Sequence, residues 1–288
     1  MKKKQIFLNL GLIILCAIIV YPFLMLLSVS FSSEKDIALY GYKLIPSHID
    51  FEAYKYVFSN PTSIIDAYKV TFIFSILAMA MSVLFDAMIA YPLSRRNMSG
   101  KRGLSFYLYF TMLFSGGLVP LYILITQYLH LGDTIWVYIL PGMISPWYVF
   151  MMRSFFSELP YEIFESVQID GGNEFVCFFK FVLPLSKPVL ATVALLTFLG
   201  KWNCWQESML YINNNELYSL QYLLQMMMSN IELLQNNKNA TNLIDISQIP
   251  SETARMAMAV VATGPALIVF PFFQKYFVKG LTIGSVKG

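Results

Sequence analysis

Residues 160–188 read PYEIFESVQIDGGNEFVCFFKFVLPLSKP and place a charged segment, broken by two glycines and bounded by prolines, between two long hydrophobic runs. The pattern predicts a short helix over residues 161–170. Pro160 suits its first turn, where a missing N–H costs little, and Ser157 can cap it. The Gly pair at 171–172 ends the helix, because Gly tolerates the left-handed conformation. A turn needs only a handful of residues, so this segment is predicted to dock something outside the hydrophobic runs.

The predicted helix has two unlike faces at a period near 3.6 residues. Its apolar residues are Ile163, Phe164, Val167 and the more distant Ile169, and its polar residues are Glu162, Glu165, Ser166 and Asp170. Asn173 can cap a second helix over residues 174–182, whose aromatic-rich sequence is expected to lie at a membrane boundary. Pro184 and Pro188 then fix how the chain enters the next hydrophobic run. A re-entrant or merely interfacial connector is the alternative.

The composition is that of a polytopic membrane protein. Hydrophobic residues make up 57% of the chain and charged residues only 13%, whereas about 25% of a soluble domain is charged. The three Cys residues form no C-x-x-C pair, and the two His residues lie far apart in the sequence. The sequence therefore predicts neither a metal cluster nor a disulfide framework.

Hydrophobic windows of about 20 residues are long enough to span a bilayer. The first window is longer than the apolar core of a signal peptide and has no small-x-small cleavage site, so a retained span is predicted. The chain is expected to be an all-α membrane protein with six transmembrane helices, over residues 6–31, 68–93, 104–127, 134–152, 188–212 and 256–277.

Lys and Arg are retained on the cytoplasmic side of membrane proteins, which sets the expected orientation. An N-terminus inside the cell places most of the 20 basic residues on that side, together with the loop 153–187. The predicted outer pieces are 32–67, the short turn 128–133, and 213–255. The predicted domains are an N-terminal helix (1–31), an extracytoplasmic segment (32–67), a transmembrane domain (68–277) and a cytoplasmic tail (278–288).

The segment at 160–188 resembles the EAA motif of binding-protein-dependent ABC importer permeases, which reads E-A-A, three residues, G, nine residues, I-x-L-P. The positions that match are Glu165, Gly171, Leu183 and Pro184. Ser166 and Val167 replace the two alanines, and Phe181 replaces the isoleucine. Asp170 matches the common D-G-A version of the motif, in which Gly172 stands for the alanine.

The C-terminus carries a second resemblance. Residues 277–288, FVKGLTIGSVKG, are similar to the closing segment of sugar-importer permeases of the maltose type, which reads GGLTAGGVKG in the smaller membrane subunit. Residues 183–188, LPLSKP, are similar to LPLSVP of the same subunit. Tyr54 within residues 51–60 and the six predicted spans agree as well, so the resemblance covers nearly the whole chain.

The resemblance implies a type I, MetI-like permease fold with a cytoplasmic coupling helix, in a bacterial cytoplasmic membrane with both termini inside. The implied partners are a second EAA-type permease, two ABC ATPase subunits and an extracytoplasmic sugar-binding protein, with no nucleic acid. The residues implied to contact the ATPase are Glu165, Ser166, Asp170, Gly171, Gly172, Leu183 and Pro184. Lys279, Gly284 and Lys287 of the tail would reach toward the ATPase, and a frayed basic terminus held by anionic lipid is the alternative.

ATP hydrolysis is assigned to a partner, because the chain has no G-x-x-x-x-G-K-[ST] and Gly200-Lys201 is followed by Trp202. No cofactor of its own is therefore expected, and no enzymatic activity.

The fifth predicted span carries a polar and aromatic cluster that could line a solute path, comprising Trp202, Asn203, Trp205 and Gln206. Aromatic faces stack on sugar rings and amides pair with hydroxyls. The alternative is an aromatic belt or subunit interface, with Lys201 and Glu207 serving packing or ion pairing. Asp86 has the same ambiguity. The amphipathic part of 213–255 could rest on the membrane or dock a binding protein.

The leading interpretation is an importer permease for a carbohydrate, with an oligosaccharide expected. A non-sugar solute would fit the same architecture. A membrane-embedded transferase is disfavoured, because the chain has neither H-E-x-x-H nor G-x-S-x-G. A secondary transporter is disfavoured because inverted repeats with broken helices are not visible in the sequence.

Overall fold

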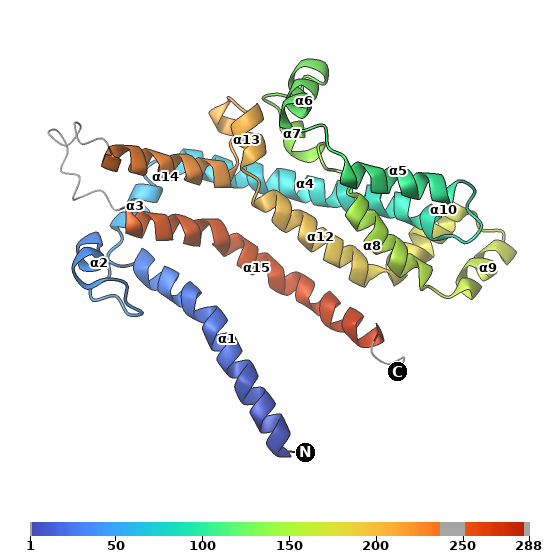
Figure 1. The fold of residues 1–288 in the computed structure, drawn as a ribbon, viewed down its shortest axis with the longest axis horizontal. Helices are drawn as coiled ribbons and strands as arrows, with labels where there is room; N and C mark the ends of the chain where they lie inside the picture. Colours follow the sequence, from blue (N-terminus) through green and yellow to red (C-terminus); the bar gives the residue numbers. More distant parts are fainter. Residues whose placement is uncertain (1, 237–250, 285–288) are drawn as a thin grey trace. The chain divides into compact units, whose positions relative to one another are not determined.

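The structure is a computed structural model that describes residues 2–236 and 251–284. It comprises two compact units, the first formed by Met1–Ile65 with Leu223–Pro265, the second by Asp66–Tyr222 with Ala266–Gly288. Figure 1 traces the helices along the chain. In the described part of the chain the secondary structure is helical, and an isolated antiparallel β-bridge joins Ser32 to Ile49.

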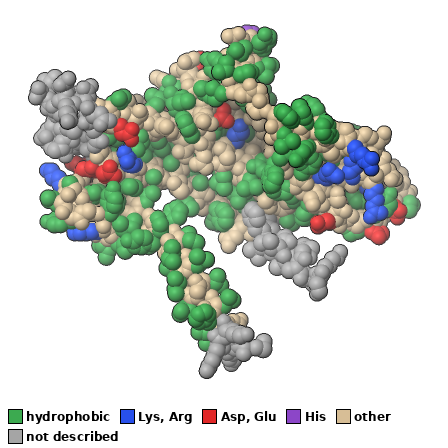
Figure 2. Space-filling model, in the orientation of Figure 1, with side chains coloured by type: hydrophobic (Ala, Val, Ile, Leu, Met, Phe, Trp, Pro, Cys, Tyr) green, Lys and Arg blue, Asp and Glu red, His purple; other side chains and the backbone are tan. Residues whose placement is uncertain are grey.

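Three described helices are long and apolar enough to cross a membrane: α1 (Lys2–Ser30), α4 (Pro61–Ser94) and α15 (Glu252–Gly284). They agree with the predicted windows 6–31, 68–93 and 256–277. Helix α1 carries hydrophobic side chains along its length, as Figure 2 shows, and those from Ile6 to Leu27 are largely exposed. A helix that is apolar all round needs lipid or other protein against it.

The other predicted windows do not form one straight helix each. Helix α5 (Lys101–Leu113) and the helix Leu118–Tyr128 meet at an angle of 109°. Gly117 provides the bend with a φ of 88°, which a residue with a Cβ rarely adopts. The one-helix prediction for 104–127 is therefore corrected.

The windows 134–152 and 188–212 are broken as well. Short α7 (Trp136–Ile139) and α8 (Pro146–Ser157) are separated by a turn in which Gly142 has a φ of 75°. Helix α12 (Lys187–Trp202) stops ten residues before the end of its window, and α13 (Gln206–Tyr211) follows. With each of two bent helix pairs counted as one span, the described residues provide up to five.

The remaining described helices are short, apart from α14. In order they are α2 (Glu34–Tyr40), α3 (Glu52–Val57), α6 (Leu118–Ile123), the π-helix η1 (Leu124–Tyr128), α9 (Tyr161–Ile169), α10 (Glu174–Cys177), the π-helix η2 (Phe178–Val182), α11 (Leu183–Leu185), the 3₁₀-helix η3 (Asn215–Leu217) and α14 (Leu220–Asn236). Leu220 and Leu224 of α14 are buried, which agrees with the amphipathic part expected within 213–255.

In the first unit, aromatic rings fasten the segment after α1. The ring of Phe31 lies 4.9 Å from that of Tyr54 and 5.7 Å from that of Phe51. The hydroxyls of Ser30 and Tyr54 are hydrogen-bonded at 2.9 Å. Tyr54 of α3 therefore holds the predicted extracytoplasmic segment against the end of α1.

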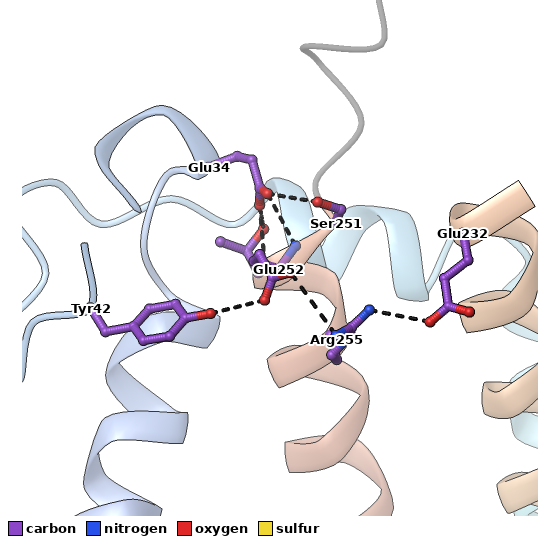
Figure 3. Close-up of polar contacts among 7 residues, drawn as sticks. Glu34, Tyr42, Glu232, Ser251, Glu252 and Arg255 are labelled. Carbon is purple, nitrogen blue, oxygen red and sulfur yellow. Dashed lines mark hydrogen bonds and ion pairs between the residues drawn. The ribbon is translucent and has the colours of Figure 1, made fainter. Parts of the chain in front are cut away.

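Also in the first unit, Glu34 caps the N-terminus of α15 (Figure 3). Its carboxylate accepts hydrogen bonds from the backbone N–H groups of Glu252 and Thr253, at 3.0 and 3.1 Å, and from the hydroxyls of Ser251 and Thr253, at 2.8 and 2.9 Å. The first N–H groups of a helix have no partner inside the helix, and they attract negative charge. Glu34 satisfies two of them from a distant part of the sequence.

The Glu34 cap predicts acid sensitivity of the first unit. Partial burial acts to raise the pKa of the carboxyl, but the four hydrogen bonds outweigh it and hold the pKa below the ordinary 4.5. A carboxyl whose pKa is lowered in the folded protein stabilises the fold when the pH is above its ordinary pKa. This stabilisation is lost as the pH falls through the lowered pKa. We expect Glu34→Gln to lower the free energy of unfolding by about 1 kcal/mol at neutral pH, with the gap closing as the pH falls through the lowered pKa of Glu34.

Thermal unfolding of the wild type and of Glu34→Gln, from neutral to acidic pH, measures the difference in stability. Glu52→Gln is the matched control, because Glu52 is exposed in the same unit and its loss should leave the pH profile unchanged. A gap between Glu34→Gln and the wild type that is equally large at acidic and neutral pH would rule out the carboxylate cap.

The second unit packs around two hydrophobic clusters along α4. One gathers Phe74 and Ala78 with buried residues of α7 and α13. The other gathers Ala87 and Ala90 with buried residues from α5, α8, α9, η2 and α12. Small residues on α4 let neighbouring helices approach closely. The second cluster positions residues 160–188.

Candidate coupling site

Helix α9 presents the polar face that the sequence predicts. Glu162, Glu165 and Ser166 are exposed, while Phe164 and Val167 are buried in the cluster around Ala87. The buried pair fastens one side of this nine-residue helix to the second unit. The charged side is exposed.

The two glycines end α9 as predicted. Gly171 has a φ of 75°, and the N–H of Gly172 donates to the carbonyl of Val167 at 2.8 Å. A Cβ at Gly172 would lie 2.7 Å from Val167 Cγ1 and 2.9 Å from its carbonyl oxygen. Only glycine fits there without movement of the helix end, and Asp170 is held exposed beside it.

Two details of the predicted helix are wrong. Ser157 does not cap α9: it is the last residue of α8, and its hydroxyl donates to the carbonyl of Arg153 at 2.8 Å. Pro160 occupies the cap position without a side-chain hydrogen bond. Ile169 is 85% exposed, because it lies on the polar side of the last turn.

The predicted second helix is present in modified form. Asn173 caps it, accepting from the N–H of Val176 at 2.9 Å. The helical segment continues through α10, η2 and α11 to Leu185, past the predicted end at residue 182. Pro184 lies in the first turn of α11, where its lack of an N–H is tolerated, directly after the wider π-turn. The segment meets α12 at 79°.

The contacts that hold α9 in place could not be predicted from the sequence. The guanidinium of Arg95, just after α4, lies 3.9 Å from the ring centre of Phe164 and 3.5 Å from Glu174 Oε1. Glu174 also accepts from the Tyr91 hydroxyl and, at 3.4 Å, from the amide of Gln168. Nothing in the sequence indicates which ring or carboxylate Arg95 meets.

The proposed solute residues gather at the break between α12 and α13, with differing exposure. Trp202 is 1% exposed, and its ring lies 5.8 Å from that of Phe198. Trp205 is half-buried, whereas Asn203 and Gln206 are exposed. The amide of Asn203 donates to the carbonyl of Leu199 at 2.9 Å and accepts from Gln221 at 3.3 Å.

The charged neighbours of this break serve local contacts. Lys201 donates to the carbonyl of Pro141 at 3.2 Å, and Glu207 lies 2.9 Å from the sulfur of Cys204. Asp86 is fully buried, accepting from Ser82 Oγ at 2.8 Å and from the N–H of Ser145 at 2.9 Å. These bonds give Asp86 a structural task at the start of α8.

The predicted tail, residues 278–288, lies only partly within the described residues. The backbone of α15 is helical through Lys279 to Gly284, whereas Lys287 lies outside the described residues. Among the residues that the structure describes, no group of three or more His, Cys, Asp or Glu could hold a metal ion.

Comparison with known proteins fits this helical architecture. Residues 64–283 match the family "Binding-protein-dependent transport system inner membrane component". Protein LplC of Bacillus subtilis is 39% identical over 94% of this chain and 90% of its own length. The polygalacturonan/rhamnogalacturonan transport system permease protein YtcP, also of Bacillus subtilis, is 36% identical over 96% of each chain.

A solved structure agrees at the level of the fold. A chain of "a bacterial ABC transporter involved in the import of the acidic polysaccharide alginate" aligns with a TM-score of 0.80 and 28% identity, over 96% of this chain and 97% of that one. The protein therefore belongs to the binding-protein-dependent transport system inner membrane components, with the helical fold of ABC importer permeases. The predicted family resemblance is confirmed.

Proposed function

We propose that this chain is one of two membrane subunits of an importer for an oligosaccharide. An external binding protein delivers the solute, and two partner ATPase subunits bind and hydrolyse the ATP. The relatives named for polygalacturonan/rhamnogalacturonan and for arabinooligosaccharides support a carbohydrate, at 36% and 30% identity. The second permease would pair with this chain as a heterodimer.

The observation that carries the coupling role is the construction of α9. Its polar side is exposed, its apolar side is buried, and the glycine pair fixes the direction in which it ends. A short helix held in this way can transmit a push from a closing ATPase dimer to the helices packed against it. Leu183 and Pro184 continue the supporting helix toward α12.

The proposed topology has six spans, with both termini, the loop 153–187 and the tail 278–288 in the cytoplasm. The distribution of Lys and Arg supports it. The broken windows 104–127 and 134–152 would cross as bent segments, because irregular backbone is tolerated at membrane depth where protein surrounds it. Lys279, Gly284 and Lys287 would approach the ATPase from the tail.

For the solute path we propose the break after α12, with Asn203 and Gln206 exposed to the sugar and Trp205 half-buried beside them. Amide groups can donate to and accept from sugar hydroxyls. The burial of Trp202 favours a supporting position behind these residues.

The coupling assignment predicts a large effect of reversing one charge. We expect Glu165→Arg to reduce ATP hydrolysis stimulated by the binding protein at least tenfold, equivalent to about 1.4 kcal/mol, because a positive guanidinium would replace the exposed carboxylate that faces the ATPase partner. The measurement is ATPase activity of the reconstituted complex, with the amount of each subunit determined.

Glu158→Arg is the matched control, since Glu158 is an exposed residue at the end of α8, outside the polar face of α9. It should retain stimulated hydrolysis. Normal coupling in Glu165→Arg would refute the role of α9, whereas transport of a non-sugar solute by an intact complex would refute only the choice of substrate.

A further inference from the structure

A cavity of about 460 Å³ lies within the second unit, lined by the end of α4 and by residues of α9, α10 and η2. Its volume falls in the range of about 300–1,000 Å³ that is typical of ligand sites. One side of the lining is basic and the other is apolar. Figure 2 shows the Lys and Arg side chains gathered at this end of the second unit beside hydrophobic ones.

The basic side comes from the residues that directly follow α4. Arg95 is largely engaged by Phe164 and Glu174. Arg96 is exposed, and its guanidinium lies 5.8 Å from the ring centre of Tyr161. Among the described side chains, no carboxylate forms an ion pair with Arg96, so it is available to an anion.

A second cavity, of about 230 Å³, extends the same basic surface. Arg95 and Arg96 line it too, together with Lys101. Lys101 Nζ donates to the carbonyl of Arg95 at 3.2 Å, which holds its charge near the two arginines. Glu174 is the one carboxylate that lines either cavity in the described part of the chain, so the two linings are positive overall.

The apolar side of the larger cavity is exposed. Met88 is 43% exposed, Phe175 68% and Phe179 49%. Met88 belongs to α4, a helix long and apolar enough to span a membrane. Phe175 lies in α10 and Phe179 in η2. Large exposed apolar side chains beside the available Arg96 match a ligand with a hydrocarbon part and an anionic head.

We propose that this cavity binds an anionic phospholipid of the cytoplasmic leaflet. The phosphate would accept charge-assisted hydrogen bonds from Arg96 and from the outer edge of Arg95. An acyl chain would cover Met88, Phe175 and Phe179. Basic pockets at the cytoplasmic side of membrane helices are suited to such headgroups. This inference rests on the cytoplasmic placement of α9 in the proposed function.

Lipid fits the lining better than the other sources of an anion. Free phosphate would engage the arginines but leave Phe175 and Phe179 in contact with water. An acidic peptide would leave Met88 of α4 uncovered. A phospholipid in this cavity would touch α4 and the α10 segment together, and so brace the support of α9 against the span.

The test is a lipid titration of the complete complex in mild detergent, followed by native mass spectrometry. The probes are phosphatidylglycerol, phosphatidylcholine and inorganic phosphate. We expect phosphatidylglycerol to bind and Arg96→Gln to weaken it about fivefold, since one basic residue near the membrane surface is worth about 1 kcal/mol. Arg102→Gln is the matched control, because Arg102 is exposed on the neighbouring α5 but lines neither cavity.

A second variant, Phe179→Ser, tests the apolar half and should weaken phosphatidylglycerol without changing phosphate binding. Equal binding of both lipids by wild type and Arg96→Gln would overturn the proposal, as would equal losses in Arg96→Gln and Arg102→Gln. Displacement of the lipid by phosphate at similar concentration would assign the site to a free anion instead. Failure to bind either lipid would also overturn the proposal. Lipid binding is measured without transport, so a failure of this proposal can be distinguished from a failure of the proposed function.

Discussion

Replacing Gly172 by Val is expected to abolish most transport while leaving the protein in the membrane. The new Cβ would lie 2.7 Å from Val167 Cγ1 and 2.9 Å from the Val167 carbonyl oxygen, so the end of α9 must move. The hydrogen bond from the Gly172 N–H to Val167 would be lost or lengthened, at a cost of about 1 kcal/mol. The larger consequence is a changed direction of α9 at its ATPase contact.

We expect uptake of an oligosaccharide that supports growth to fall at least tenfold, which corresponds to about 1.4 kcal/mol. Cell uptake and the amount of membrane-inserted protein are measured together. Gly103→Val is the control, because Gly103 lies inside α5 and a Cβ there meets nothing within 4 Å. Wild-type uptake by Gly172→Val would show that the direction of α9 does not matter.

Replacing Asp86 by Ala is expected to have the largest effect on stability. The carboxylate is fully buried and accepts from Ser82 Oγ and from the N–H of Ser145. Removing it leaves a buried backbone donor unpaired and opens a small void, which together should lower the free energy of unfolding by about 2–3 kcal/mol. The thermal midpoint of the purified protein measures this loss.

Two companion variants make the result specific to the buried hydrogen bonds. Asp86→Asn keeps an oxygen acceptor for the N–H of Ser145 and should lose much less stability than Asp86→Ala. Asp66→Ala removes a carboxylate from the first turns of the same helix, where it pairs at 3.0 Å with an exposed Lys69, so a loss of less than about 1 kcal/mol is expected. If Asp86→Ala and Asp66→Ala have the same thermal midpoint, the contact between Asp86 and Ser145 contributes little to stability.

The sequence predicted the position of hydrophobic helices better than their continuity. The windows that became α1, α4 and α15 are regular, because no glycine with a left-handed backbone interrupts them. Gly117 and Gly142 break two other windows, with φ values of 88° and 75°. Hydropathy averages over such positions, and Gly is tolerated inside membrane helices, so its presence alone did not predict a bend.

At the site, local rules predicted local structure. The glycine pair after α9 and the Asn173 cap follow from neighbours within a few residues. Ser157 had the right chemistry for a cap, but α8 extends to it and engages its hydroxyl. The contacts of Arg95 with Phe164 and Glu174 join residues about 70 to 80 positions apart, and no periodicity in the sequence indicates such a pairing.

The Glu34 cap has a consequence for the order of biosynthesis. Its partners begin at Ser251, 217 residues later in the chain. At a synthesis rate of about 5–20 residues per second, Glu34 is complete roughly 10–40 s before the helix that it caps. The carboxylate must remain hydrated during that interval, so the first unit can close only when the last helix of the chain has been made.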